Sequence, residues 1–474
     1  MTPSKITYKG VIVMAKLNEK YGLYMAVAMV IGSVIGSGVF FKAELICRIT
    51  GGEGALGTMA WLIGGASMLL CLLSFSCLVR KYGSENGLVG IAERSVGKSY
   101  SYYVGWFMAT IYYPTLASVL AWLSARYTLM FFGTEDFGGG LCMLLSCLYL
   151  ILSFAQNSLF PAFSGRFQVV TTALKLVPLV LMIVFGILKG NSSGILYHNF
   201  AISPSSEMDF KALFPAVTAS LFAYEGWIAA ASIGSELKNS RRNLPIALIL
   251  GGTAVMAVYV LYYTGILGAV SSETLLNYGP DGIRMAFRAV LGKSASQFLT
   301  LFVAISCLGA LNGMMIGCGR AMYVLAVGER GPAYKTFSQL APHGGMPIAS
   351  FISGLVFSVL WLVFLFGAQI SDTPLFSSFS FDSSEMPVVT IYAMYIPMFF
   401  VFIMKSRKEK NIMSLIVTAA GICACLFIMT CAIIAHGRDV LDYLITFTVV
   451  MLVGAIFEKK IKGAEAPFNI TNLS

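Results

Sequence analysis

Long apolar runs separated by short polar segments make up most of this chain. Each run is close to the length of about 20 residues that a helix needs to cross a bilayer core. The pattern predicts an all-α integral membrane protein with twelve transmembrane helices, in a single domain over residues 1–474. The runs lie at about 20–46, 56–79, 101–131, 141–160, 167–188, 210–235, 244–270, 296–327, 347–369, 386–404, 411–435 and 439–457.

Two runs carry helix-breaking residues inside them. The first contains "IGSVIGSG" at 31–38, and the sixth contains Glu225-Gly226 between aromatic residues. Interrupted spans at matching positions are typical of transporters built from inverted repeats, with the binding site at the breaks. We therefore expect a 5+5 inverted repeat, with broken helices 1 and 6. Its halves would be 20–188 and 210–404, and two additional helices would follow at 411–457.

A break in the middle of a membrane has a chemical use. It leaves free N–H groups at the start of one half-helix and free C=O groups at the end of the other. The first set attracts a carboxylate and the second an ammonium group, so together they suit an α-amino acid. The alternative for "IGSVIGSG" is a face of small residues that lets helices pack closely. The matching break in the sixth run favours the binding site.

The charges agree with a membrane protein and indicate its orientation. Only 11% of the residues are charged and 57% are hydrophobic. The 32 Lys and Arg residues concentrate in alternate loops, including 236–243 and 405–410. By the positive-inside rule, these loops and both termini are cytoplasmic. The net charge of +10 is explained by these loops, so we expect no nucleic-acid partner.

No pattern of catalytic or metal-ligating residues emerges. The ten cysteines lie in or beside the runs without metal-ligand spacing. "AERSVGKS" (92–99) lacks the first glycine of a phosphate-binding loop, and "GASM" (65–68) resembles an intramembrane serine protease without a histidine inside a span to act as base. We therefore expect a protein that is not an enzyme and has no catalytic residue, metal or cofactor.

Several motifs resemble one family of transporters. "IGSVIGSGVF" (31–40) resembles the first-span signature of the amino acid–polyamine–organocation (APC) superfamily. "LFAYEGW" (221–227), "SELKNSRRNLPIAL" (235–248) and "SCLGALNG" (306–313) resemble the L-amino-acid transporter (LAT) branch and its bacterial amino-acid exchangers. The resemblance implies the LeuT-type fold and amino-acid transport across the plasma (cell) membrane.

Two departures from the LAT pattern bear on partners and substrate. Animal members pair with a glycoprotein heavy chain through a cysteine in the loop after the third span. Here that loop reads "FGTEDFGGG", and Cys142 falls inside the fourth predicted span. We therefore expect no disulfide-linked heavy chain. The tenth span, at 380–398, also departs from the animal pattern and leaves the substrate's side chain open.

The resemblance assigns substrate-binding residues at both breaks. It implies that the Gly36–Gly38 stretch gives N–H groups to the carboxylate and that Ile35 gives its carbonyl to the amino group. It also implies that Phe222 is a gating aromatic, the alternative being an ordinary core residue. The complete predicted set is Ile35, Gly36, Ser37, Gly38, Phe222, Ala223, Glu225 and Gly226.

Two charged residues lie deep in predicted spans. Glu225 contacts a substrate ammonium, binds a transported proton, or makes a structural hydrogen bond. Lys175 lies nine residues after Arg166, about 13 Å along a helix. By resemblance it occupies the sodium position of sodium-coupled relatives, with its donors near the carbonyls of Val34 and Ile35. The alternative for Lys175 is a buried pair with another residue.

These observations lead to one preferred function. The protein is expected to be a secondary transporter of L-amino acids that works by sodium-independent alternating access, with exchange preferred by resemblance. Proton-coupled symport of amino acids or cationic amines is the alternative mechanism. A membrane amino-acid sensor is the alternative of another class, although the short tails favour transport. A channel would require a continuous polar path, which one central carboxylate does not supply.

Overall fold

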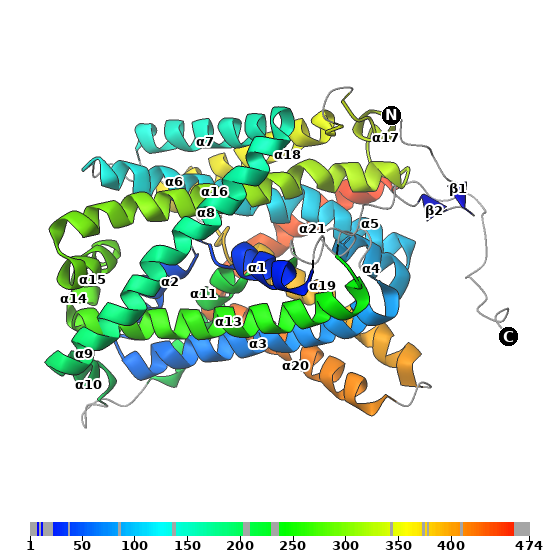
Figure 1. Ribbon diagram of the computed structural model, residues 1–474. Coiled ribbons are helices and arrows are strands. Elements are labelled where there is room, and N and C mark those ends of the chain that lie inside the picture. The colour runs from blue at the N-terminus through cyan, green and yellow to red at the C-terminus, as the bar shows by residue number, and fades with distance from the viewer. Residues whose placement is uncertain are drawn as a thin grey trace.

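The computed structural model describes most of the chain as a helical bundle (Figure 1). The described residues are 7–8, 11–12, 22–36, 38–83, 87–134, 139–201, 209–228, 237–341, 345–371, 375–376, 379–407 and 411–458. Two short strands, β1 (Thr7–Tyr8) and β2 (Val11–Ile12), pair antiparallel near the N-terminus.

The helices follow the apolar runs closely. Short 3-10 and π segments, labelled η, interrupt or extend several of them. In chain order the elements are α1 (Leu23–Val34), α2 (Gly38–Ile49), α3 (Gly54–Tyr82), α4 (Gly87–Ser95), α5 (Lys98–Phe107), η1 (Met108–Tyr112), α6 (Tyr113–Phe131), α7 (Gly140–Leu159), α8 (Pro161–Leu181), η2 (Met182–Gly186), α9 (Ile187–Ser193), α10 (Ile195–Phe200), η3 (Phe210–Ala212), α11 (Leu213–Tyr224), α13 (Ser240–Ala269), α14 (Ser272–Tyr278), α15 (Pro280–Leu291), α16 (Lys293–Val327), α17 (Tyr334–Phe337), α18 (Ile348–Leu365), η5 (Phe366–Ile370), α19 (Met386–Ser406), α20 (Ile412–His436) and α21 (Asp439–Phe457).

The predicted class, an all-α multi-pass membrane protein, is confirmed. Among the described residues, ten helices are long and apolar enough to span a bilayer, and α1 with α2 forms an eleventh span bent by 49°. The sixth predicted run, 210–235, is represented by the shorter apolar helix Phe210–Tyr224, and residues 229–236 lie outside the described part. The count of twelve and the inverted repeat therefore stay predictions.

The short helices that carry the breaks lie inside the bundle. In Figure 1, α3 and α13 run side by side, as do α6 and α16, and both pairs pack along their length. Helix α1 packs on α13, and α11 packs on α2 and α3. Long helices thus enclose the broken ones, which keeps their free backbone groups away from lipid.

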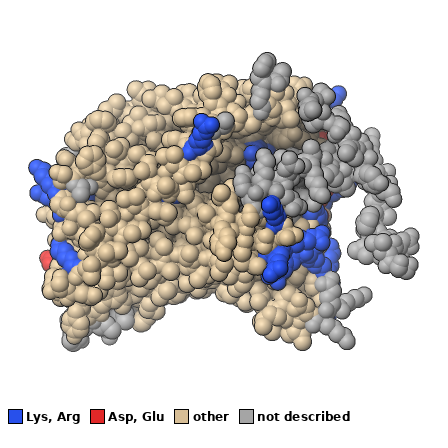
Figure 2. All heavy atoms as spheres, in the orientation of Figure 1, with Lys and Arg blue, Asp and Glu red and all other residues tan. Residues whose placement is uncertain are grey.

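The outer surface matches this arrangement. Figure 2 shows a broad area without charged side chains, and most Lys and Arg side chains gather at the two ends of the molecule. Large apolar side chains are exposed on the peripheral helices, for example Leu144 on α7, Ile416 on α20 and Leu452 on α21. Such a surface is stable in lipid, where exposed apolar groups have no cost.

Candidate functional site

Both helix breaks appear where the sequence predicts them. Helix α1 ends at Val34, and Ile35 continues in an extended conformation with φ −65° and ψ 104°. Helix α11 ends at Tyr224, and Glu225 is likewise extended. Gly226 follows with φ +113°, a conformation that side chains other than glycine rarely adopt. Ser37 lies outside the described residues.

The two breaks touch each other through their glycines. A Cβ atom added to Gly226 would lie 2.5 Å from the carbonyl oxygen of Ser33. One added to Gly38 would lie 2.7 Å from the Cα of Ala223. Any larger residue at either position would push the two chain segments apart. The glycines are therefore required by the close approach of the breaks.

Tyr259 of α13 connects the two breaks and was not predicted from the sequence. Its buried hydroxyl lies 3.0 Å from the carbonyl oxygen of Val34 and 3.0 Å from that of Ala223. One hydroxyl hydrogen bonds one carbonyl at a time. Tyr259 therefore supports unwound backbone at both breaks. Nothing in the apolar run around it distinguishes this residue from the other 21 tyrosines of the chain.

A cavity opens beside the breaks, between α1, α2, α6, α11 and α16. It holds about 380 Å³ of space, part of which connects to the solvent. Of the predicted residues, Ile35 and Gly226 do not line this cavity: Ile35 is completely buried, and Gly226 packs on Ser33. The lining consists of Ser33, Val34, Gly36, Gly38, Leu116, Leu120, Phe222, Ala223, Glu225, Ala310 and Met314.

Phe222 separates this cavity from a buried charged group on α2. Its ring packs edge-on against Phe41, with ring centres 5.4 Å apart. The ammonium of Lys42 lies 5.5 Å from the centre of the Phe222 ring, within the range of a cation–π interaction. The aromatic ring is therefore well placed for the predicted gate, and the gating role itself stays a prediction.

Lys42 belongs to a cluster of charged residues that sequence reasoning missed. Its ammonium forms a salt bridge with Glu385 and donates to the hydroxyl of Ser384 at 3.2 Å. The other carboxylate oxygen of Glu385 lies 2.9 Å from Nε2 of His436 at the end of α20. The cluster therefore connects α2 to α20 and to the segment that leads into α19.

Asp382 completes this charged cluster. Its Oδ1 accepts hydrogen bonds from the backbone N–H groups of Ser384 and Glu385, at 2.7 and 2.8 Å. Burial alone would raise the pKa of Asp382, but the Lys42 ammonium and the Ser384 hydrogen bond outweigh it and hold the pKa below its ordinary value. The carboxylate therefore stays ionised and fixes the start of α19.

Lys175 lies in the middle of the span formed by α8, and it is 2% exposed. Its ammonium donates to the carbonyl oxygen of Gly32, which lies two and three residues before the predicted contacts near Val34 and Ile35. The Gly32 carbonyl lies in the last turn of α1, where carbonyls lack helical partners. Gly32 also lets α8 approach, because an added Cβ would lie 2.8 Å from Thr172.

Glu225 is buried, and one of its oxygens is held by a neighbouring span. Oε1 accepts a hydrogen bond of 2.5 Å from the hydroxyl of Tyr112. Tyr112 ends a five-residue π segment, η1, that interrupts the helix formed by α5 and α6. Such π segments occur frequently at functional sites. The local widening of the helix brings Tyr112 to the second break.

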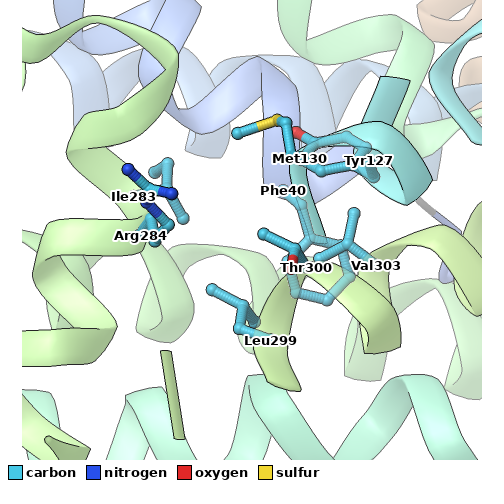
Figure 3. Close-up of a pocket in the computed structure, with 8 residues that line it drawn as sticks. All are labelled: Phe40, Tyr127, Met130, Ile283, Arg284, Leu299, Thr300 and Val303. Carbon is cyan, nitrogen blue, oxygen red and sulfur yellow. The ribbon is translucent and has the colours of Figure 1, made fainter. Parts of the chain in front are cut away.

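A second, smaller cavity lies between α2, α6, α15 and α16. It holds about 270 Å³ and contains none of the predicted site residues. Figure 3 shows its lining, in which Phe40, Tyr127 and Met130 face Ile283 and Arg284 across an open space. Arg284 forms a half-exposed ion pair with Asp281 at 3.4 Å. This cavity shares α2 with the central one but not its unwound backbone.

The breaks, the buried charges and the central cavity define a broken-helix membrane transporter. A family model described as "Amino acid permease" matches residues 21–456, so the chain belongs to the amino acid permease family. Its members are transporters rather than enzymes, and the predicted resemblance to the APC superfamily is confirmed.

Several transporters are similar over most of the chain. The serine/threonine exchanger SteT of Bacillus subtilis (strain 168) is 28% identical over 83% of this chain and 85% of its own length. The human b(0,+)-type amino acid transporter 1 is 26% identical over 73% of this chain and 70% of its own. The human cystine/glutamate transporter is 24% identical, with shares of 77% and 71%.

Proposed function

We propose that this protein exchanges L-amino acids across the plasma membrane by sodium-independent alternating access. The observation that carries the proposal is the cavity at two touching helix breaks, both of which contribute to its lining. The relative named as a serine/threonine exchanger supports the exchange mechanism. A single chain suffices in this proposal, and the absence of a disulfide-linked heavy chain agrees with Cys142, which is buried in α7.

Backbone groups recognise the part that all amino acids share. The N-terminus of α2, from Gly36 through Ser37 to Gly38, offers N–H groups to the carboxylate. The carbonyl of Ile35, at the end of α1, accepts from the amino group together with Phe222 and Ala223. Glu225 and Gly226 complete the second break. The substrate displaces Tyr259 from the carbonyls that it occupies in this structure.

Lys175 replaces a coupling cation. A sodium ion at this position would bind carbonyl oxygens of α1, and the Lys175 ammonium already donates to one of them. In the described residues, no acidic side chain forms an ion pair with Lys175, so its contact with α1 is the one that stabilises the unwound segment. This arrangement supports transport without sodium.

The remaining features of the proposal concern orientation and organisation. Both termini and the loops at 236–243 and 405–410 are cytoplasmic, as the excess of basic residues there indicates. The single domain contains repeats at 20–188 and 210–404, followed by α20 and α21. The charged cluster around Lys42 then lies on the outer side of Phe222.

The test uses the purified protein in liposomes. Vesicles are preloaded with unlabelled amino acid or left empty, and uptake of each of the twenty labelled amino acids is measured in sodium and in choline. We expect uptake into preloaded vesicles only, at equal rates in both salts. Uptake that needs sodium contradicts the role of Lys175, and uptake into empty vesicles contradicts exchange. Gly226→Ala should abolish uptake, because its side chain would separate the breaks.

A further inference from the structure

Four buried polar atoms without hydrogen-bond partners surround the second break. They are Oε2 of Glu225, Nε1 of Trp227, and the hydroxyls of Tyr392 and Tyr395 on α19. The ring of Tyr395 lies 5.6 Å from that of Trp227 and 5.5 Å from that of Tyr392. Both α19 phenols lie within electrostatic range of the Glu225 carboxyl group. Unpartnered polar atoms are rare in protein interiors, so a cluster of four requires an explanation.

The charges around Glu225 help to explain why these polar atoms lack partners. Among the described residues no Lys, Arg or His forms an ion pair with it. The titratable groups that interact with it electrostatically are phenols and one thiol, which are neutral at ordinary pH. They are Tyr112 and Tyr113 on η1 and α6, Tyr392 and Tyr395 on α19, and Cys71 on α3.

An ionised carboxylate at this place would have no countercharge. Burying such an ion costs several kcal/mol even after the surroundings relax. The hydrogen bond from Tyr112 and the interaction with the Gly226 N–H offset part of that cost and leave the other oxygen unpartnered. Binding a proton removes the charge, so the neutral acid is the form that this environment stabilises.

We propose that Glu225 is a proton-binding site of the transport cycle and is protonated in the conformation that this structure shows, in which its side chain is buried. The proton forms an O–H bond at Oε2, which donates to the α19 hydroxyls through water held among the four unpartnered atoms. When the cavity opens to either side, water reaches the carboxyl group and the same O–H bond releases its proton. No electron transfer is involved.

This inference rests on the proposed exchange function and adds a proton to it. A proton travels with the amino acid in each direction, so balanced exchange moves no net proton. The exchange rate nevertheless depends on pH, because the conformation in which Glu225 is buried forms easily only when Glu225 is neutral. The cation that neutralises Glu225 is thus supplied by the solvent and not by the substrate, which leaves the site open to neutral amino acids.

The first experiment measures exchange in preloaded liposomes between about pH 5.5 and 8, with equal pH on both sides. We expect the wild-type rate to fall as the pH rises, and Glu225→Gln to exchange at a rate that no longer depends on pH. Tyr112→Phe should move the midpoint of the profile to higher pH, because it removes a donor to the ionised form. Tyr392→Phe/Tyr395→Phe should move it to lower pH, because it removes acceptors of the protonated form.

A matched control is available on α13. Tyr262 is also completely buried and also has an unpartnered hydroxyl, but its electrostatic partner is Tyr127 and not Glu225. Tyr262→Phe should leave the midpoint unchanged. A shift of about one pH unit in the Tyr112 and α19 variants corresponds to a tenfold change in proton affinity. A wild-type rate that stays constant over this range overturns the inference.

The second experiment does not depend on transport. Infrared spectra of the purified wild-type protein at neutral pH should show the carbonyl band of a protonated carboxylic acid. The band should disappear in Glu225→Gln and remain in Glu385→Gln. If exchange fails at every pH but the band behaves as expected, the proposed function is wrong and the proton site stands. A band that is absent from the wild type, or that persists in Glu225→Gln, overturns the proton site.

Discussion

Two buried carboxyl groups, Glu385 and Glu225, differ in almost everything except their burial. They are 5% and 6% exposed, and both lie beside the start or end of a helix. Glu385 contacts the Lys42 ammonium with one oxygen and His436 with the other. Glu225 has the hydroxyl of Tyr112 at one oxygen and no partner at the other. Burial alone therefore does not decide what a carboxyl group does in a membrane protein.

The difference lies in where each countercharge comes from. The cluster around Glu385 contains its own cation, so its charge stays fixed and connects α2 to the segment before α19. The site around Glu225 contains phenols and an indole, which supply no countercharge, so the neutral acid is the form that this site stabilises. The first arrangement suits a structural connection and the second suits a proton that comes and goes.

The largest expected effect is the loss of Glu385. Glu385→Gln leaves the Lys42 ammonium buried without its partner, which costs about 3–5 kcal/mol of unfolding free energy. Glu225→Gln replaces an acid that is neutral in the folded protein and should not lower the same quantity by more than about 1 kcal/mol. Chemical denaturation in detergent micelles measures both. Equal losses in the two variants would contradict the comparison.

The next effect concerns Lys175, a third buried charge. Lys175→Ala removes the donor to the Gly32 carbonyl and leaves that buried acceptor without a partner, which costs about 1–3 kcal/mol. We expect uptake that is slower by about tenfold, the rate equivalent of 1.4 kcal/mol, and still independent of sodium. Initial uptake in sodium and in choline tests this. A variant that transports at the wild-type rate would show that the contact only packs α8 against α1.

A smaller loss of stability is expected when both residues of the salt bridge, Lys42 and Glu385, are replaced. Lys42→Met/Glu385→Met removes both members of the salt bridge but leaves the Asp382 carboxylate and His436, so only part of the stability lost in Glu385→Gln should return. The connection between α2 and α19 is lost, however. A cysteine placed at Leu120 in the central cavity should then react faster with an impermeant thiol reagent from outside. Unchanged reactivity would show that the charged cluster does not control access past Phe222.

The sequence predicted those parts of the site that depend on local features. Glycine and an acidic residue within an apolar run interrupt a helix wherever the run is placed, so the breaks at Ile35 and Glu225 were predictable. Lys175 was predictable because a lysine in the middle of a span needs a buried acceptor. The carbonyl that it reaches, that of Gly32, lies two residues before Val34, since the helix continues to Val34 and the Gly32 carbonyl lies in its last turn.

Features that depend on distant partners escaped prediction. Lys42 and Glu385 are 343 residues apart, and each lies near the end of an apolar run, where charged side chains ordinarily reach the membrane surface. Tyr259 lies among other aromatic residues of α13, and its contact with the two breaks follows only from the packing of α13 on α1. The unpartnered polar atoms of Trp227, Tyr392 and Tyr395 come together only in the folded bundle, so the sequence did not predict them either.

The smallest expected effect is a difference in how the stabilities of Asp382 and Glu225 variants depend on pH. The pKa of Asp382 is held below its ordinary value of 3.8, so its interaction with Lys42 stabilises the fold at pH values above 3.8 and is lost as the pH falls through that value and below. Asp382→Asn should therefore be less stable than wild type by about 1 kcal/mol at pH 7, and the gap should narrow as the pH falls below 3.8. The gap between wild type and Glu225→Gln should change in the opposite direction, because a carboxyl group that is protonated in the folded protein but ionised in the unfolded chain makes the wild type gain stability relative to Glu225→Gln as the pH falls towards about 4.3. Unfolding free energies in micelles at several pH values give both curves. If wild type instead loses stability relative to Glu225→Gln on acidification, Glu225 is ionised in the folded protein and both buried sites hold fixed charges.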